Sequence, residues 1–213
     1  MSNEHSKVIN KVAKKLLKPQ GIVQKGQSRI WLDDHGWFTT IIEFQPRDKA
    51  KGSFLNIAAH FHWHKKDCFS FDLGYRELDF VEYKNDEQFA KKMEKFCELT
   101  IEKVLEIRKK LATLHSAKKV ILGHTFVSEE IWGKYHKGTI CGLTGDIEKL
   151  NKHYGDLLKY EHRCNAPFID ELKENTKFIQ SKASNLELFK AEILSIIAET
   201  RKLKKLPEME IML

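Results

Sequence analysis

Three histidines stand at every second position in the stretch AAHFHWHKKD, which covers residues 58–67. Imidazole nitrogen is a common ligand of zinc, held about 2.1 Å from the ion. In a β-strand, residues two apart point to the same face and lie about 6.8 Å apart, so two neighbouring imidazoles reach one ion. The spacing therefore makes His60, His62 and His64 candidate metal ligands.

The same alternation has a second interpretation, in which the histidines lie on the solvent-facing side of a strand. The opposite face, which we expect to pack on the core, carries Leu55, Ile57, Ala59, Phe61 and Trp63. A metal site also needs a ligand from a neighbouring strand, and the candidates are Glu43, Gln45, Cys68 and Asp72. Because no HExxH or cysteine-pair motif accompanies the histidines, we favour the solvent-facing strand and keep a divalent metal as the alternative.

A ligand groove is a third interpretation of this region. Its candidate binding residues for a peptide or a phosphate are Arg29, Trp31, Glu43 and Gln45, on strands next to the histidines. The chain contains no GxSxG nucleophile elbow and no glycine-rich phosphate loop. The enzyme classes that carry those motifs are therefore not indicated, and no residue is assigned a catalytic role.

The positive charge of the chain is concentrated near its start. The net charge is +7, and no acidic residue lies between Lys7 and Arg29. The basic patch consists of Lys7, Lys11, Lys14, Lys15 and Lys18. Apolar residues recur between these lysines at helical spacing, which indicates a helix with a solvated basic face. Binding of nucleic acid through the segment from Lys7 to Arg29 is the alternative, because a basic segment attracts polyanions.

The elements that position these residues follow from hydrophobic periodicity. A helix is expected from about 6 to 18, before Pro19, and a hairpin of 29–33 and 37–45 around the turn 34–36. Strands are expected over 54–64 and in the run CFSFDLGY, which ends near 75. From Asn85, a helix cap, the period changes to 3.6 and continues to about 114. The stretch 118–127 is either a last strand or a buried connection.

The remainder of the chain is predicted to be helical. Two antiparallel helices meet at Thr144-Gly145-Asp146, where the glycine ends one helix and the aspartate caps the next. Their glycines and bulky residues alternate as in a single tetratricopeptide-like hairpin, although a repeat array needs at least about three such units. Two more helices are expected at about 167–181 and 185–204, and the apolar tail LPEMEIML is expected to dock.

The predicted fold class is α+β: a small antiparallel sheet of about four strands packed on an N-terminal helix and a long helix, followed by a C-terminal helical bundle. We expect an α+β domain over 1–117 and a helical region over 118–213, with a soft boundary that also allows one integrated domain. Because parallel strands need long crossovers, the short loops favour an antiparallel meander.

The N-terminal part of the chain, about residues 8–80, resembles the bacterial family named "domain of unknown function 4304". The likeness lies in LLKPQGIVQKGQ, in Phe44-Gln45 at the end of a hairpin, and in Leu55-Asn56-Ile57 on an extended strand. The chain departs from the family at Gly21-Ile22-Val23, where an aromatic residue is replaced. The resemblance implies an α+β fold in a bacterial cytoplasm, without an established reaction or catalytic residue.

Composition agrees with a soluble globular protein. Of the 213 residues, 41% are hydrophobic and 31% are charged, and no apolar run approaches the roughly 20 residues that a membrane span requires. The cysteines Cys68, Cys97, Cys141 and Cys164 form no CxxC pair, which favours reduced thiols in the cytoplasm. We expect a non-catalytic module that binds a protein partner. A metal-dependent, hydrolase-like enzyme using His60 and His62 is the first alternative, and nucleic-acid binding is the second.

Overall fold

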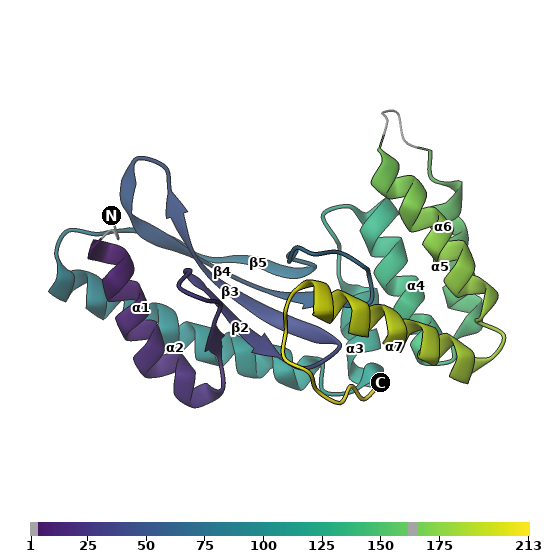
Figure 1. Cartoon of the computed structure of the whole chain (residues 1–213). Coiled ribbons are helices and arrows are strands. Elements are labelled where there is room, and N and C mark those ends of the chain that lie inside the picture. Colours follow the sequence, from purple (N-terminus) through teal and green to yellow (C-terminus); the bar gives the residue numbers. More distant parts are fainter. Residues whose placement is uncertain (1–3, 162–165) are drawn as a thin grey trace. The chain divides into compact units, whose positions relative to one another are not determined.

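The computed structural model describes residues 4–161 and 166–213. These residues form a five-stranded antiparallel sheet and seven α-helices, which confirms the α+β fold class (Figure 1). The chain divides into two compact units. The sheet unit comprises residues 1–61 and 69–109, and the helical unit comprises residues 62–68 and 110–213.

The sheet is a meander in the order β1-β2-β3-β4-β5. Its strands are β1 (Val23–Gln24), β2 (Ile30–Asp34), β3 (Phe38–Arg47), β4 (Ala50–Phe61) and β5 (Leu73–Glu82). The predicted β2–β3 hairpin is confirmed, and Gly36 supplies the positive φ of 80° that its turn requires. The predicted strand in CFSFDLGY has the wrong bounds, because residues 68–72 form a loop and β5 starts at Leu73 and continues beyond the expected end near 75.

Two helices pack on one face of this sheet, as Figure 1 shows for α1 (Glu4–Leu17) and α2 (Asp86–Lys110). The core between them and the sheet combines Ile9 and Phe89 from the helices with Ile42, Leu55 and Ile57 from the strands. The helix α1 ends where η1 (Lys18–Gln20) begins around Pro19. The side chain of Asn85 accepts a hydrogen bond from the backbone N–H of Gln88 at 2.9 Å, which confirms the predicted cap of α2.

The helical unit contains α3 (Leu114–Gly123), the π-helix η2 (Glu129–Gly133), α4 (Lys134–Leu143), α5 (Ile147–Lys159), α6 (Pro167–Ser181) and α7 (Leu186–Leu203). Because α3 occupies 114–123, the strand alternative for 118–127 is wrong. The tail after Leu203 forms no strand, and the guanidinium of Arg201 donates to the carbonyl oxygen of Pro207 at 2.7 Å. No helix within the described ranges combines the length and the hydrophobicity that a bilayer crossing requires.

The division between the units falls at Lys109–Lys110, whereas the expected boundary of 117 lies inside α3. The larger difference is the segment 62–68, which interrupts the sheet unit in sequence and belongs to the helical unit. The chain therefore passes from one unit to the other three times, after Phe61, after Cys68 and after Lys109.

The predicted hairpin of α4 and α5 is confirmed. Asp146 caps α5 by accepting from the backbone N–H of Lys149 at 3.3 Å, and Gly145 has a positive φ of 75°. A Cβ on Gly138 would lie 2.3 Å from the ring of Tyr154, which is fully buried and whose hydroxyl lies 2.9 Å from the Thr139 hydroxyl. Glycine at 138 therefore allows the two helices to approach closely.

Gly138→Ala is expected to lower the free energy of unfolding by about 1–3 kcal/mol, because overpacking against a fixed ring outweighs the gain in helix propensity. Gly155→Ala is the matched control on α5, since a Cβ there meets nothing within 4 Å. It is expected to raise the free energy of unfolding by about 0.5–1 kcal/mol. Urea unfolding followed by circular dichroism measures both, and equal effects would contradict the close approach.

Candidate functional site

The three histidines of the opening stretch do not share one strand face. Strand β4 ends at Phe61, so His62 and His64 follow the strand and belong to the helical unit, whereas His60 belongs to the sheet unit. The prediction of a solvent-facing strand is wrong, because His60 and His62 are each 0% exposed. Within the sheet unit, the ring of Phe69 lies 5.4 Å from the ring of His60, so the returning loop covers this face.

His60 takes part in a compact polar cluster with Ser70 and Asp72. Its Nδ1 lies 3.0 Å from the Ser70 hydroxyl and 3.1 Å from Asp72 Oδ2. The Ser70 hydroxyl donates to Asp72 Oδ1 at 2.5 Å, and the backbone N–H of Phe61 donates to Asp72 Oδ2 at 2.8 Å. These contacts join the end of β4 to the loop before β5.

This cluster has the residue types of a hydrolytic triad but not its geometry. In a triad, the serine and the carboxylate use opposite ring nitrogens of the histidine. Here Ser70 and Asp72 both lie at Nδ1 of His60, and the hydroxyl directs its proton to the carboxylate. Asp72 was among the expected partners of the histidines, whereas nothing in the residue spacing indicated Ser70. The arrangement fixes the loop and does not activate the serine.

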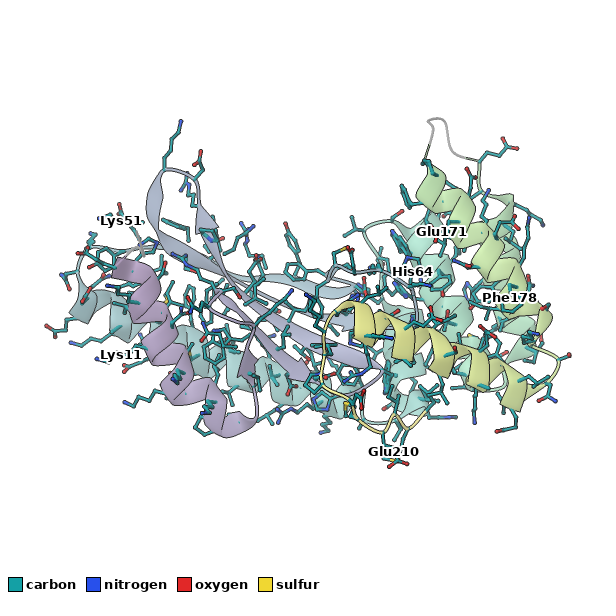
Figure 2. The ribbon with its side chains drawn as sticks, viewed as in Figure 1. Lys11, Lys51, His64, Glu171, Phe178 and Glu210 are labelled. Carbon is teal, nitrogen blue, oxygen red and sulfur yellow. The ribbon has the colours of Figure 1, made fainter. Side chains whose placement is uncertain are left out.

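The expected metal ligands are not brought together as a set. Across residues 4–161 and 166–213, no group of three or more His, Cys, Asp or Glu side chains is arranged to hold a metal ion. His64, labelled in Figure 2, belongs to the helical unit. Its ring centroid lies 4.6 Å from that of Trp132 and 5.7 Å from that of Tyr135. Cys68 is exposed and free, and Cys164 lies outside the described residues.

The helical unit holds the segment 62–68 through both side chains and backbone. The indole N–H of Trp63 donates to His136 Nδ1 at 2.9 Å, and the Tyr135 hydroxyl donates to the Trp63 carbonyl oxygen at 2.6 Å. The Thr200 hydroxyl donates to the His64 carbonyl oxygen at 3.2 Å. The ammonium of Lys204 donates to the carbonyl oxygen of Lys66. The helices α4 and α7 thus bind the same short segment.

A cavity of about 190 Å³ lies beside this segment, between α6 and α7. Its lining includes His64 and Tyr135, together with Asn175, Phe178 and Glu192. At its edge, the ammonium of Lys65 lies 2.7 Å from the carboxylate of Glu199, and both side chains are largely exposed. Because both charges stay largely in water, the ion pair contributes little to closing the cavity.

The four candidate binding residues do not form one groove. Trp31 pairs with Ile42 in the β2–β3 register and is buried in the core, whereas Glu43 pairs with Ile30 and points to the opposite face. Arg29 donates to the Ser6 hydroxyl at 2.7 Å and to the Gly52 carbonyl oxygen at 3.1 Å. The prediction of a shared groove is therefore wrong, because the alternation of the strand separates its members.

Glu43 and Gln45 belong to a hydrogen-bonded network on the face away from α1 and α2. The amide of Asn56 donates to Glu43 at 2.8 Å and to Gln45 at 3.1 Å. Arg76 donates to Gln45 at 2.7 Å and lies 3.9 Å from the ring centroid of Phe54. The members of the network come from the three adjacent strands β3, β4 and β5 and bond to one another.

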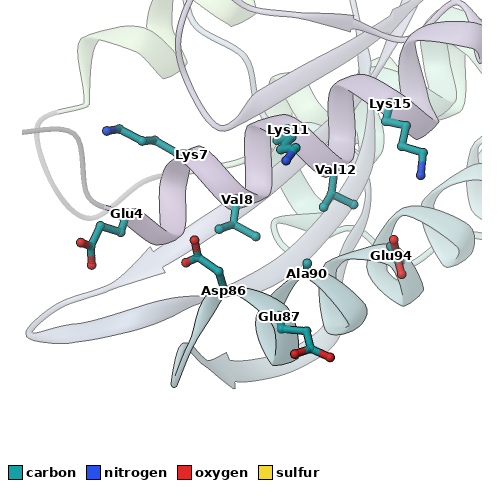
Figure 3. Close-up of a pocket in the computed structure, with 10 residues that line it drawn as sticks. All are labelled: Glu4, Lys7, Val8, Lys11, Val12, Lys15, Asp86, Glu87, Ala90 and Glu94. Atoms are coloured by element: carbon teal, nitrogen blue, oxygen red, sulfur yellow. The ribbon is translucent and has the colours of Figure 1, made fainter.

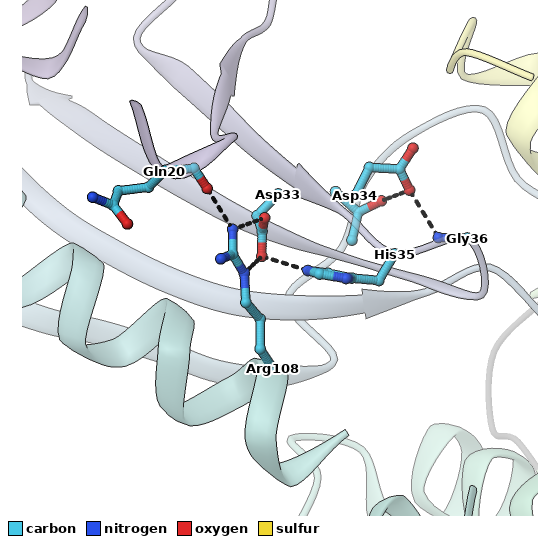
Figure 4. Close-up of polar contacts among 7 residues, drawn as sticks. Gln20, Asp33, Asp34, His35, Gly36 and Arg108 are labelled. Carbon is cyan, nitrogen blue, oxygen red and sulfur yellow. Dashed lines mark hydrogen bonds and ion pairs between the residues drawn. The ribbon is translucent and has the colours of Figure 1, made fainter. Parts of the chain in front are cut away.

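A second network, centred on the buried carboxylate of Asp33, joins β2 to the end of α2 (Figure 4). Arg108 donates to the two oxygens of Asp33 at 2.6 and 3.0 Å and to the Gln20 carbonyl oxygen at 2.8 Å. His35 Nε2 lies 2.7 Å from the same carboxylate. Burial raises the pKa of Asp33, but the hydrogen bonds from His35 and Arg108 outweigh it and hold that pKa below its usual value.

The surface between α1 and α2 is open and carries both signs of charge (Figure 3). It is a groove of about 580 Å³, with a small apolar floor of Val8, Val12 and Ala90. Its charged lining consists of Lys7, Lys11 and Lys15 on α1, Asp86, Glu87 and Glu94 on α2, and Glu4 at the start of α1. Three of the five lysines of the basic patch thus line a groove, whereas Lys14 on α1 and Lys18 in η1 are exposed outside it.

The two charged walls of this groove do not neutralise each other directly. In the part of the chain that the structure describes, no ion pair joins the three lysines to the four carboxylates. Glu87 pairs with Lys91 on its own helix at 2.9 Å, and Asp86 accepts from the Tyr83 hydroxyl at 2.6 Å. The lysine row follows from the spacing in the sequence, whereas no residue spacing places the carboxylates of α2 opposite it. This groove is the candidate functional site.

Comparison with known proteins adds no relative to this description. No protein-family model, curated protein or solved structure matches the chain.

Proposed function

We propose that this protein is a non-catalytic binding module that engages a partner protein through the groove between α1 and α2. The observation that carries the proposal is the lining of the groove: an apolar floor between a row of lysines and a row of carboxylates. Apolar contact surrounded by charges of both signs is the composition of protein-binding surfaces, where burial supplies affinity and charge supplies selectivity.

The mixed charge of the groove favours a protein ligand over nucleic acid. Three lysines face four carboxylates, so phosphates placed along the lysine row would also lie near Glu4 and the acidic wall. Polyanion binding depends on the net neutralisation of phosphates by cations, and the groove offers no net positive charge. Lys14 on α1 and Lys18 in η1 are exposed outside the groove, and a polyanion that bound the basic segment would contact them there.

The polar clusters around His60 and Asp33 support an enzyme less well than the groove supports a binding module. His60 lies in a hydrogen-bonded set with Ser70 and Asp72 that ties a loop to a strand end. Asp33 is already engaged by Arg108 and His35. A metal-dependent hydrolase therefore ranks second. The resemblance to the "domain of unknown function 4304" family, and with it a bacterial cytoplasmic setting, stays a prediction.

Photo-crosslinking in the source cell tests the proposed groove. A benzoylphenylalanine at position 11, where Lys11 lines the groove, is expected to form a discrete protein adduct. The same group at position 14 is the matched control, because Lys14 is exposed on the same helix and does not line the groove. Equal adducts at both positions, or none at position 11, would contradict the proposal. Nuclease-sensitive adducts at position 14 would favour the nucleic-acid alternative.

A further inference from the structure

The α1–α2 groove combines features that together specify the shape and charge of its occupant. We infer that the occupant is an amphipathic helix with acidic side chains along one flank and basic side chains along the other. The inference rests on the proposed function and extends it from a binding site to a class of partner.

The first step is the alignment of the charged side chains in one row along each helix. Lys7, Lys11 and Lys15 are four residues apart, so they form one row along α1 that covers about 12 Å at 1.5 Å per residue. Glu87 and Glu94 are seven residues apart and project from one face of α2. Figure 3 shows Asp86 toward the end of the groove where Glu4 lies, Glu87 below Ala90, and Glu94 toward the end where Lys15 lies. The two rows therefore run alongside each other for about two helical turns.

The second step concerns the backbone of the occupant. Both walls are α-helices, and beyond their first turns at Glu4 and Asp86 the backbone N–H and C=O groups bond within each helix, so most of the groove presents side chains. An extended peptide would have backbone donors and acceptors turned toward an apolar floor without partners, which costs free energy. A helix satisfies its own backbone groups before it binds. The groove therefore suits a helix, in the manner of other helix-in-groove complexes.

The third step is charge complementarity. Within the described residues, Lys7, Lys11 and Lys15 have no ion-pair partner, and Glu94 likewise forms no ion pair. Carboxylates spaced four residues apart on a helix repeat about every 6 Å, which is also the repeat of the lysine row. The flank of the occupant that faces α2 must then be basic, because carboxylates there would oppose Glu87 and Glu94.

The floor limits which apolar side chains the occupant inserts. Val8, Val12 and Ala90 are small, and the valines are nearly buried by their own packing on the sheet. A small floor leaves room for bulky side chains from the opposite surface, so the central stripe of the partner helix is expected to carry leucine, methionine or phenylalanine.

A designed peptide tests this inference on the full-length protein. The probe is a helix of about 18 residues with a leucine stripe, glutamates at four-residue spacing on one flank and lysines on the other. Fluorescence anisotropy in about 50 mM salt is expected to give affinity at least about tenfold above that of a scrambled peptide of identical composition. Equal binding of the two peptides would overturn the inference.

Two charge-reversed double variants locate the binding. Lys11→Glu with Lys15→Glu is expected to weaken binding about tenfold, because attractive pairs become repulsive. Lys14→Glu with Lys18→Glu makes the same change in net charge outside the groove and is expected to have little effect. A peptide with lysines on both flanks is expected to prefer the Lys11/Lys15 variant over the unmodified protein. Equal effects of the two double variants would overturn the assignment of the groove.

The two proposals fail in distinguishable ways. If position 11 captures a partner but the designed helix does not bind, the groove remains a protein-binding site and the helical occupant is wrong. A variant of the peptide with a central proline distinguishes a helical from a non-helical occupant, because proline breaks the helix and leaves the composition almost unchanged. Binding of that variant with unchanged affinity would also overturn the helical occupant.

Discussion

Replacing Trp63 with alanine is expected to lower the free energy of unfolding of the helical unit by about 3–5 kcal/mol. The side chain is 0% exposed, and its indole N–H donates to His136 while its carbonyl oxygen accepts from Tyr135. Alanine removes a large buried ring and leaves His136 Nδ1 without its donor. Urea unfolding monitored by far-ultraviolet circular dichroism measures the loss.

Trp63→Phe separates packing from hydrogen bonding at this position. Phenylalanine keeps much of the buried surface but has no N–H, so the expected loss is about 1–3 kcal/mol. Because an indole N–H only donates, the accepting nitrogen of His136 carries no proton, and the neutral ring has its hydrogen on Nε2. A loss below about 1 kcal/mol for Trp63→Ala would contradict a tightly held segment 62–68.

Arg108→Ala is expected to lower the stability of the sheet unit by about 2–4 kcal/mol at neutral pH, because it leaves a buried carboxylate without its main partner. The side chain of Asp33 is 4% exposed, and both of its oxygens accept from Arg108. Lys103→Ala is the matched control on the same helix, since its pair with Glu77 spans 3.5 Å and is more exposed. That change is expected to cost about 0–1 kcal/mol.

The pH dependence of the Arg108→Ala effect has a defined sign. The pKa of Asp33 is lower in the folded protein than its usual value of about 3.8. The contribution of the ionised carboxylate to stability is therefore complete above about pH 4 and is lost as the pH falls through the lowered folded value. The difference between the unmodified protein and Arg108→Ala is expected to shrink over that acidic range. A pH-independent difference, or one equal to that of Lys103→Ala, would contradict the buried pair.

The helices could be predicted from the sequence because their signals are local. The apolar stripe of α1 ends next to Pro19, Asn85 caps α2, and Asp146 follows a glycine that ends α4. The hairpin around Gly36 is equally local, since two β-rich runs flank one turn. In each case a few neighbouring residues determine the backbone conformation, so spacing alone was sufficient.

The errors concern what covers a face and which distant residues meet. The alternation of side chains along the strand correctly placed Ile57 and His60 on opposite faces of the sheet. It contained no information about the loop that brings Phe69 against the histidine. Asp33 and Arg108 are 75 residues apart, and no period connects them. For the same reason, the sequence predicted only one wall of the groove. The lysines follow one helical row, whereas the opposing carboxylates lie on a helix that begins 71 residues after Lys15.

The excursion of residues 62–68 into the helical unit has a consequence for synthesis on the ribosome. Lys66 and Lys204, which share a hydrogen bond, are 138 residues apart. At roughly 5–20 residues per second, the ribosome completes that interval in about 7–28 s. During this time β4 and β5 can already pair, and Tyr135 and His136, which bond to Trp63, are made about halfway through the interval. The loop between β4 and β5 therefore stays without its contacts to Thr200 and Lys204 in a nascent chain whose strands can already have paired, so the last helix made completes the enclosure of a segment made early.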